Sequence, residues 1–125
     1  MIEIYPLRDK DKLKTLYSDN NIEMTENSIA VVASDSNEVF GFCLFEMNTD
    51  NLLIHTIEPK DDKFLADGIL RSALHVGVEN GIMTAFYSIN APESLFSALA
   101  FIKNIEKREL NVEKLFSSCK NCGND

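Results

Sequence analysis

The chain has 125 residues, a formal net charge of -8 and a pI near 4.7. This length suits one domain, and 45% apolar residues with a mean hydropathy of -0.11 are typical of a folded globular protein. The acidic charge excludes nucleic acid and anionic lipid as favoured partners, because both depend on lysine and arginine for affinity. No stretch approaches the about 20 apolar residues that span a bilayer, and the charged N-terminus lacks the apolar run of a secretion signal, so we expect a cytoplasmic protein.

The first half of the chain is predicted to form a strand, a helix and then a meander of three strands. Asn20-Asn21 ends the predicted helix, and the turn-prone segment Asp35-Ser36-Asn37 separates two apolar runs that read as a hairpin. A second polar turn, at 48–51, leads into the last strand of the meander. The expected strands are 1–5, 28–34, 39–47 and 52–57.

The second half begins with the clearest helix signal in the chain, an apolar stripe that repeats every three or four residues. Its members are Phe64, Leu65, Ile69, Leu70, Ala73, Leu74 and Val78. Asp61 or Asp62 is the expected N-cap and Asn80-Gly81 the expected C-cap. The apolar run at 83–89 then predicts a strand, and a strand, helix, strand passage of this length predicts a parallel right-handed crossover.

The C-terminal part is predicted to continue with another helix, which Asn90 and Pro92 open. Its apolar positions are Leu95, Phe96, Leu99, Ala100 and Ile102. Residues 105–116 fit either a strand or a short helix. We expect one domain over 1–116 and a flexible tail over 117–125.

This order of elements, with a ligand-type loop after the fourth strand, resembles the GCN5-related N-acetyltransferase (GNAT) superfamily over about residues 1–102. The residues that carry the resemblance are Gly41, the strand end Ile57-Glu58-Pro59, the segment 63–70 and Asn80-Gly81. The resemblance implies a mixed α/β (α+β) sheet of five to six strands flanked by three to four helices. The family's last two strands would have to come from 105–116, and the sequence leaves open whether they are missing.

The resemblance also implies acetyl-CoA as the acyl donor. In the family, a Gln/Arg-x-x-Gly-x-Gly/Ala loop wraps the pyrophosphate, and Lys63-x-x-Ala66-x-Gly68 is similar to it. Free amides and the positive dipole at a helix N-terminus bind phosphate, and small residues let the backbone come close. The cofactor contacts carried over in this way are Ile57, Lys63, Phe64, Leu65, Ala66, Asp67, Gly68 and Ile69, with Glu58 beside Ile57 offering backbone groups to the pantetheine arm.

Three aspartates in the same segment oppose phosphate binding. A carboxylate about 5 Å from a phosphate costs about 3 kcal/mol at an effective dielectric of 20, so Asp61, Asp62 and Asp67 can cancel the contribution of Lys63. Capping and the helix dipole explain Asp61 and Asp62 without any ligand. Asp67 lies within the loop motif and lacks that explanation.

The family's proton donor to the departing CoA thiolate is also replaced. Matching Ala100-Phe101 to a Gly-Phe pair of the family places Phe96 where many members carry a tyrosine. Phenylalanine cannot donate a proton, and a positioned general acid contributes about 10² to 10⁴-fold in rate. The sequence therefore predicts weakened catalysis.

Candidate catalytic residues are few, and we assign His55 and Glu58. His55 lies in an apolar central strand, where a neutral imidazole could deprotonate an amine; the alternative is a hydrogen-bonded core or cleft histidine. Glu58, and likewise Glu46, lies at a strand end and could serve instead, the alternative being a solvated end residue. His75 is expected at the surface of its helix.

The three cysteines are too few and odd in number for a disulfide framework. Cys43 reads as a core residue, whereas Cys119 and Cys122 form a CxxC that could bind zinc or form a redox disulfide. Zinc needs four ligands, and the chain has no second CxxC or histidine pair, so we assign no metal site.

Three functions stay open at this point. The first is an acetyl-CoA-dependent N-acetyltransferase, monomeric or homodimeric, that acts on a small primary amine through a degenerate cofactor loop. The second is a catalytically weak or inactive ligand-binding or regulatory module with the same fold. The third is a metal or thiol protein that acts through the CxxC.

Overall fold

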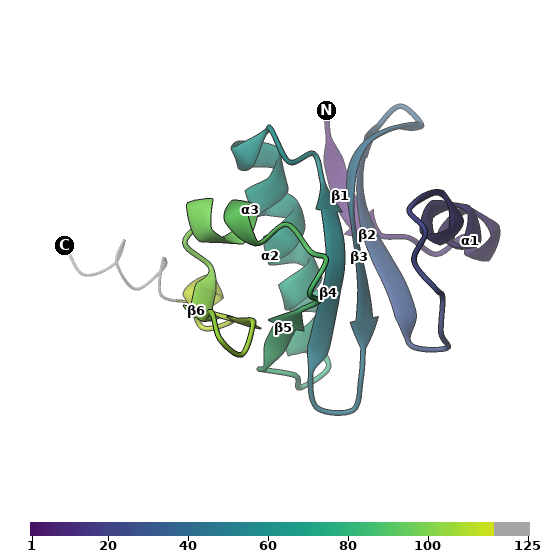
Figure 1. Cartoon of the computed structure of the whole chain (residues 1–125). Helices are drawn as coiled ribbons and strands as arrows, with labels where there is room; N and C mark the ends of the chain where they lie inside the picture. Colours follow the sequence, from purple (N-terminus) through teal and green to yellow (C-terminus); the bar gives the residue numbers. More distant parts are fainter. Residues whose placement is uncertain (117–125) are drawn as a thin grey trace.

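The computed structural model describes residues 1–116 (Figure 1). The elements, in chain order, are β1 (Glu3–Pro6), α1 (Lys10–Asp19), β2 (Ser28–Asp35), β3 (Glu38–Met47), β4 (Leu52–Glu58), α2 (Lys63–Glu79), β5 (Ala85–Tyr87), α3 (Glu93–Ala98), β6 (Ile102–Asn104) and β7 (Glu109–Leu110). One seven-stranded sheet has the order β1-β2-β3-β4-β5-β7-β6, with α1 on one face and α2 and α3 on the other (Figure 1). The predicted mixed α/β fold is confirmed.

The N-terminal half follows the predicted order of elements. Asn21 ends α1 because it adopts a left-handed backbone (φ 57°), from which its amide donates to Ser18 O at 3.1 Å and the Ile22 amide donates to Tyr17 O at 3.1 Å. This pair of bonds satisfies the last carbonyls of the helix. Strands β2, β3 and β4 then pair antiparallel in succession, as the predicted meander.

The turn between β2 and β3 has the geometry that a two-residue hairpin requires. Ser36 and Asn37 have φ values of 52° and 74°, the positive angles of a type I′ turn. Their backbone twist matches that of the flanking strands, so the hairpin continues into a long antiparallel pair.

The crossover from β4 through α2 to β5 is parallel, as predicted. Asp62 is the N-cap of α2, and its side chain accepts from the Leu65 amide at 3.1 Å. At the other end Gly81 has φ 81°, and the Ile82 amide donates back to Gly77 O at 2.8 Å. These caps explain why the helix begins and ends where the sequence indicates.

The predicted extension of the last helix to Ile102 is wrong. α3 ends at Ala98, because Ala100 takes a left-handed backbone (φ 61°) and the Phe101 amide donates to Phe96 O at 3.0 Å. The apolar spacing continues past this turn because Phe101 and Ile102, although outside the helix, pack on the same core.

The two C-terminal strands are present. Ile102 belongs to β6, which pairs antiparallel with β7, and β7 in turn pairs antiparallel with β5. The segment 105–116, predicted as either a strand or a short helix, contains both. Turn residues 105–108 lead into strand β7, and residues 114–116 form one helical turn.

The core has two parts, one on each face of the sheet. The larger part lies between the sheet and the helices α2 and α3, and Cys43 is fully buried in it, as predicted. The smaller part lies beneath α1 and contains Leu13, Tyr17, Ala30 and Leu44. Burial raises the pKa of the Cys43 thiol, which leaves it a packed, unreactive group. Within residues 1–116, no helix is both long and apolar enough to cross a membrane.

Candidate functional site

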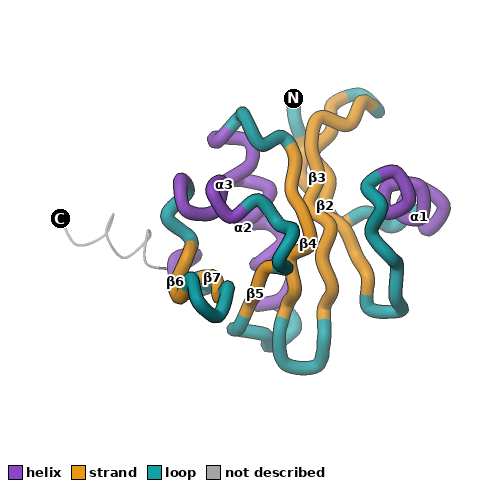
Figure 2. The backbone as a smooth tube through the Cα atoms, in the orientation of Figure 1, coloured by secondary structure: helices purple, strands orange, loops and turns teal. Residues whose placement is uncertain are grey.

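Strands β4 and β5 part near the middle of β4 (Figure 2). Their parallel pairing covers three positions and ends where Ile54 lies opposite Tyr87. The Ser88 amide adds one more bond, to Ile54 O at 2.9 Å. Strand β4 runs on to Glu58 and stays paired with β3 alone. Among the described strands, none pairs with the edge of residues 55–58 on the β5 side, which leaves a wedge between β4 and β5.

A polar pocket of about 360 Å³ lies at this wedge. Its lining combines the loop after α1, the free end of β4 and the residues after β5. The lining residues are Asn20, Asn21, Ile22, His55, Thr56, Glu58, Lys60, Ser88 and Asn90. This volume lies in the range of small-molecule sites, and the amide, hydroxyl and charged groups suit a polar ligand.

Gly41 lets the end of β4 approach both β3 and α2. A Cβ atom at this position would lie 2.6 Å from Glu58 O, 2.7 Å from Ile69 Cδ1 and 2.9 Å from Pro59 Cδ. These distances are too short for any side chain, so only glycine allows the three segments to converge. The position of the end of β4, which borders the pocket, therefore depends on a residue outside the pocket lining.

His55 and Glu46 lie together on the face of the sheet that α1 covers. His55 Nε2 is 2.8 Å from Glu46 Oε2, and the two side chains are only 15% and 18% exposed. The His55 ring also stands edge-on to the Tyr17 ring, with centroids 6.5 Å apart. Glu58, the other residue assigned to catalysis, lines the same pocket, where its carboxylate contacts the Lys60 ammonium group.

The N-terminus of α2 offers few free amides. The Leu65 amide donates to Asp62 Oδ1 at 3.1 Å and the Ala66 amide donates to Asp62 O at 2.9 Å. The amides of Lys63 and Phe64 are the first two of the helix and have no intrahelical acceptor. The Phe64 side chain beside them is 93% exposed.

The remaining residues assigned to the cofactor lie within the helix rather than in a loop. Ala66 and Ile69 are fully buried in the core, and a methyl group at Gly68 would lie 3.3 Å from Ile4 Cδ1, a tight contact that the end of the Ile4 side chain would have to relieve. Asp67 accepts from Arg71 Nε at 2.8 Å, an ion pair between successive turns of α2. Asp67 therefore has a structural partner, which the sequence argument did not supply.

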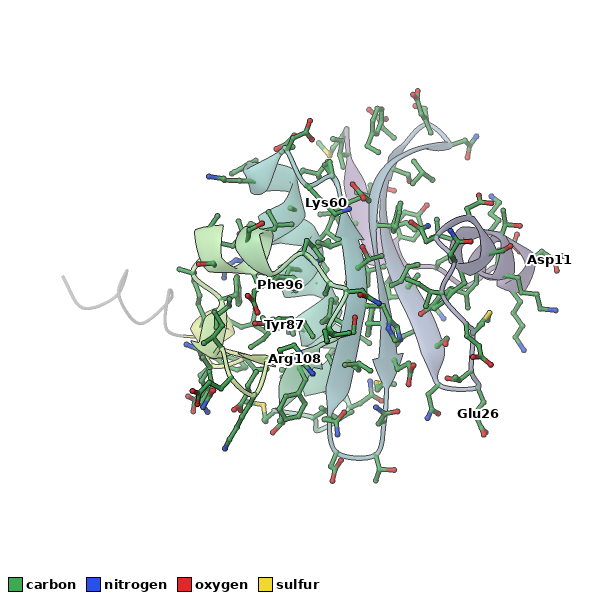
Figure 3. The ribbon with its side chains drawn as sticks, viewed as in Figure 1. Asp11, Glu26, Lys60, Tyr87, Phe96 and Arg108 are labelled. Atoms are coloured by element: carbon green, nitrogen blue, oxygen red, sulfur yellow. The ribbon has the colours of Figure 1, made fainter. Side chains whose placement is uncertain are left out.

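Phe96 is fully buried on the α2 face of the sheet, with its ring centroid 5.1 Å from that of Tyr87, and Figure 3 labels the two residues close together. The Tyr87 hydroxyl donates to Glu93 Oε2 at 2.6 Å. Burial and the adjacent Glu93 carboxylate raise the pKa of Tyr87 to about 12. Sequence reasoning missed this pair, for which the available signal was a tyrosine in a short buried strand and a glutamate in the first turn of the next helix.

Sequence reasoning also missed most of the pocket lining. Asn20, Asn21, Thr56, Ser88 and Asn90 come from three separate segments. Each is a polar residue at or near the end of a helix or strand, and that is the only local signal they carry.

Cys119 and Cys122 lie outside the described residues. Within residues 1–116, no group of three or more His, Cys, Asp or Glu side chains is arranged to hold a metal ion.

Comparison with solved structures places this architecture in a known class: the chain has the fold of the GNAT acetyltransferases. The ribosomal-protein-S18-alanine N-acetyltransferase from Escherichia coli matches with a TM-score of 0.56 and 14% identity, over 87% of this chain and 88% of that one. The aminoglycoside N-acetyltransferase AAC(6')-Iy in complex with CoA matches with a TM-score of 0.58 and 13% identity, over 81% of this chain and 92% of that one.

A third structure, the ribosomal-protein-alanine N-acetyltransferase from Brucella melitensis biovar Abortus 2308, has a TM-score of 0.56 and 14% identity, over 80% of this chain and 89% of that one. No family model and no curated protein matches the sequence. The likeness is therefore one of fold, which agrees with the resemblance drawn from the order of the elements.

Proposed function

We propose that the protein is an acetyl-CoA-dependent N-acetyltransferase whose acceptor is a small primary amine. The observation that carries the proposal is the wedge between β4 and β5, with the polar pocket at its mouth. An unpaired strand edge offers backbone groups to an extended ligand arm, and Ile57 and Glu58 lie on that edge. The solved N-acetyltransferases with this fold support the choice of reaction, and one of them was solved with CoA.

The reaction needs one proton acceptor on this chain. The amine lone pair forms a C–N bond to the thioester carbonyl carbon, the C–S bond breaks, and CoA leaves as a thiolate. The proton released by the amine nitrogen goes to His55, which lines the pocket. The thiolate takes a proton from water, because Phe96 has no proton to give. Glu58 is less suited to the role of base, since its carboxylate already contacts Lys60.

The residues at the N-terminus of α2 fit the pyrophosphate only in part. The amides of Lys63 and Phe64 and the positive end of the helix dipole favour an anion. The Asp62 carboxylate occupies the next amide, and Asp61 adds a second negative charge beside it. We therefore expect CoA to bind weakly.

The proposal is tested by calorimetry with acetyl-CoA and by thiol release in the presence of a panel of primary amines. We expect binding heat at ligand concentrations up to about 1 mM, equivalent to about 4 kcal/mol of binding free energy, and acetyl transfer to at least one amine. His55→Gln should lower the rate by about 100-fold or more and leave acetyl-CoA binding intact. The absence of binding heat at that concentration would remove the proposal.

Binding of an acyl-CoA without transfer is the second candidate function. Two observations favour this candidate. The Asp62 carboxylate accepts a hydrogen bond from an α2 amide, and the fully buried Phe96 occupies the position where a proton donor is expected. Binding heat without thiol release for any amine would support this candidate over the enzyme.

A further inference from the structure

The chain carries two histidines, and each lies near a glutamate in a different setting. His55 and Glu46 are on neighbouring strands, largely buried, and 2.8 Å apart. His75 and Glu79 are one turn apart on α2, about 60% exposed, and 3.7 Å apart. Polar groups that are taken out of water need a partner, so the first contact is a fixed part of the structure, whereas the second is a surface proximity.

A bulge in β4 directs His55 toward Glu46. Leu44 pairs with Thr56 and Phe45 pairs with Ile54, so His55 is the extra residue of the bulge and has no paired residue on β3. A bulge of this kind re-aims a side chain. The bulge brings the His55 side chain onto the α1 face of the sheet, where Leu44 packs beneath α1 and Tyr17 lies beside the His55 ring.

We propose that Glu46 is a positioning residue that holds the His55 imidazole by its Nε2–H and leaves Nδ1 as the nitrogen that accepts the proton. A carboxylate can only accept hydrogen bonds, so the shared proton lies on His55 Nε2. The hydrogen bond at one ring nitrogen sets which nitrogen carries the lone pair. This inference rests on the proposed acetyl transfer, in which His55 is the base.

The His55 ring also lies beside a fixed aromatic ring. The Tyr17 ring meets it edge-on at an interplanar angle of 80°. The Tyr17 hydroxyl lies 2.8 Å from Ile29 O and 2.9 Å from Phe45 O, which secures α1 on the sheet. The imidazole is therefore held by its hydrogen bond to Glu46 and lies edge-on to a fixed aromatic ring.

Glu46 acts through His55 rather than on the substrate. His55 lines the pocket and Glu46 is not among the lining residues. When His55 takes the amine proton it becomes an imidazolium, and the Glu46 carboxylate faces that positive charge at hydrogen-bond distance. The pair thus orients the base and stabilises its protonated form.

The pairing is tested by ¹H–¹⁵N NMR of the two histidine rings, without any ligand. We expect a slowly exchanging Nε2–H signal for His55 and none for His75, whose ring is open to water. Glu46→Leu should abolish the His55 signal and Glu46→Gln, which keeps an acceptor oxygen, should retain it. Glu79→Leu is the matched control and should change nothing. A His55 signal that survives in Glu46→Leu overturns the proposal.

The catalytic consequence is tested on the amine that the thiol-release panel identifies. Glu46→Leu should lower kcat by about 10 to 100-fold, with KM for acetyl-CoA changed less than about twofold, and Glu46→Gln should recover most of kcat. An unchanged kcat in Glu46→Leu contradicts the role of Glu46. Should the wild-type protein acetylate nothing while the NMR signal depends on Glu46, the pairing stands and the proposed acetyl transfer is what fails.

Discussion

The wedge between β4 and β5 and the N-terminus of α2 are the two ends of one candidate binding path, and they differ in what their residues supply. At the wedge, the strand edge, the polar pocket and the His55–Glu46 pair are all in place. At α2, the helix N-terminus presents free amides and the positive end of its dipole, but the exposed carboxylates of Asp61 and Asp62 lie where an anion would bind. Strand length and one glycine shape the first end, whereas side-chain charge shapes the second, so the two ends can be altered independently of each other.

The largest effect is expected at Gly41, which lets the end of β4 lie close to β3 and α2. Gly41→Ala should lower the free energy of unfolding by about 1–3 kcal/mol, because its methyl group would meet Glu58 O at 2.6 Å. Gly68→Ala is the matched control at the other end, and should change the free energy of unfolding by less than about 1 kcal/mol, because the preference of alanine for a helix interior opposes the small shift that Ile4 Cδ1, 3.3 Å away, must make. Urea unfolding measures both.

Equal losses in the two glycine variants would show that Gly68 is also held by close packing. Acetyl-CoA titration of the folded variants sharpens the comparison further. A large loss of affinity in Gly68→Ala would show that this residue serves the phosphate loop of the family motif, although it lies in the second turn of α2.

An effect of similar size is expected at Phe96, where the resemblance to the GNAT superfamily places a tyrosine as proton donor. Phe96 is fully buried, so Phe96→Tyr should lower the free energy of unfolding by about 1–3 kcal/mol through a buried hydroxyl and should not speed thiol release. Thermal unfolding and the amine assay measure the two results. Faster turnover in this variant would mean that the side chain at position 96 reaches the leaving thiolate despite its burial, and that the wedge has a place for a proton donor.

The order of elements could be predicted from the sequence because each signal was local. Asn20-Asn21, Asp35-Ser36-Asn37 and Asn80-Gly81 all adopt the positive φ angles or helix caps that their residue types favour. Ala100 shows the limit of this approach. Alanine has no preference for a left-handed backbone, so nothing in the sequence indicated that α3 stops before it.

The candidate site could be predicted only where one residue stood out against its surroundings. His55 was conspicuous in an apolar strand, but its bulge and its bond to Glu46 depend on the register between two strands. The pocket lining comes from three separate segments and has no shared pattern in the sequence. The partner of Asp67 lies only four residues away, so the i,i+4 spacing to Arg71 was a signal that was available and missed.

A smaller effect is expected from the charges at the α2 end. The double variant Asp61→Asn, Asp62→Ser should raise the affinity for CoA by roughly fivefold, because each exposed charge opposes the phosphates by roughly 0.5 kcal/mol after screening. Serine keeps the N-cap, so stability should hold. Asp11→Asn removes a charge from α1 on the opposite face (Figure 3) and is the control. An equal gain from Asp11→Asn would show that net charge, and not the α2 end, limits binding.

The smallest effect is expected at Asp67, the aspartate that the family motif leaves unexplained. Its carboxylate is bonded to Arg71 and both side chains are about one-third exposed, so its charge is already balanced on the helix. Asp67→Asn should therefore change CoA affinity by less than about twofold and lower the free energy of unfolding by about 0.3–0.5 kcal/mol. Calorimetry beside the Asp61 and Asp62 variants gives the comparison. A gain as large as theirs would mean that Asp67 faces the phosphates, and that the amides of the second turn, rather than those of Lys63 and Phe64, form the anion site.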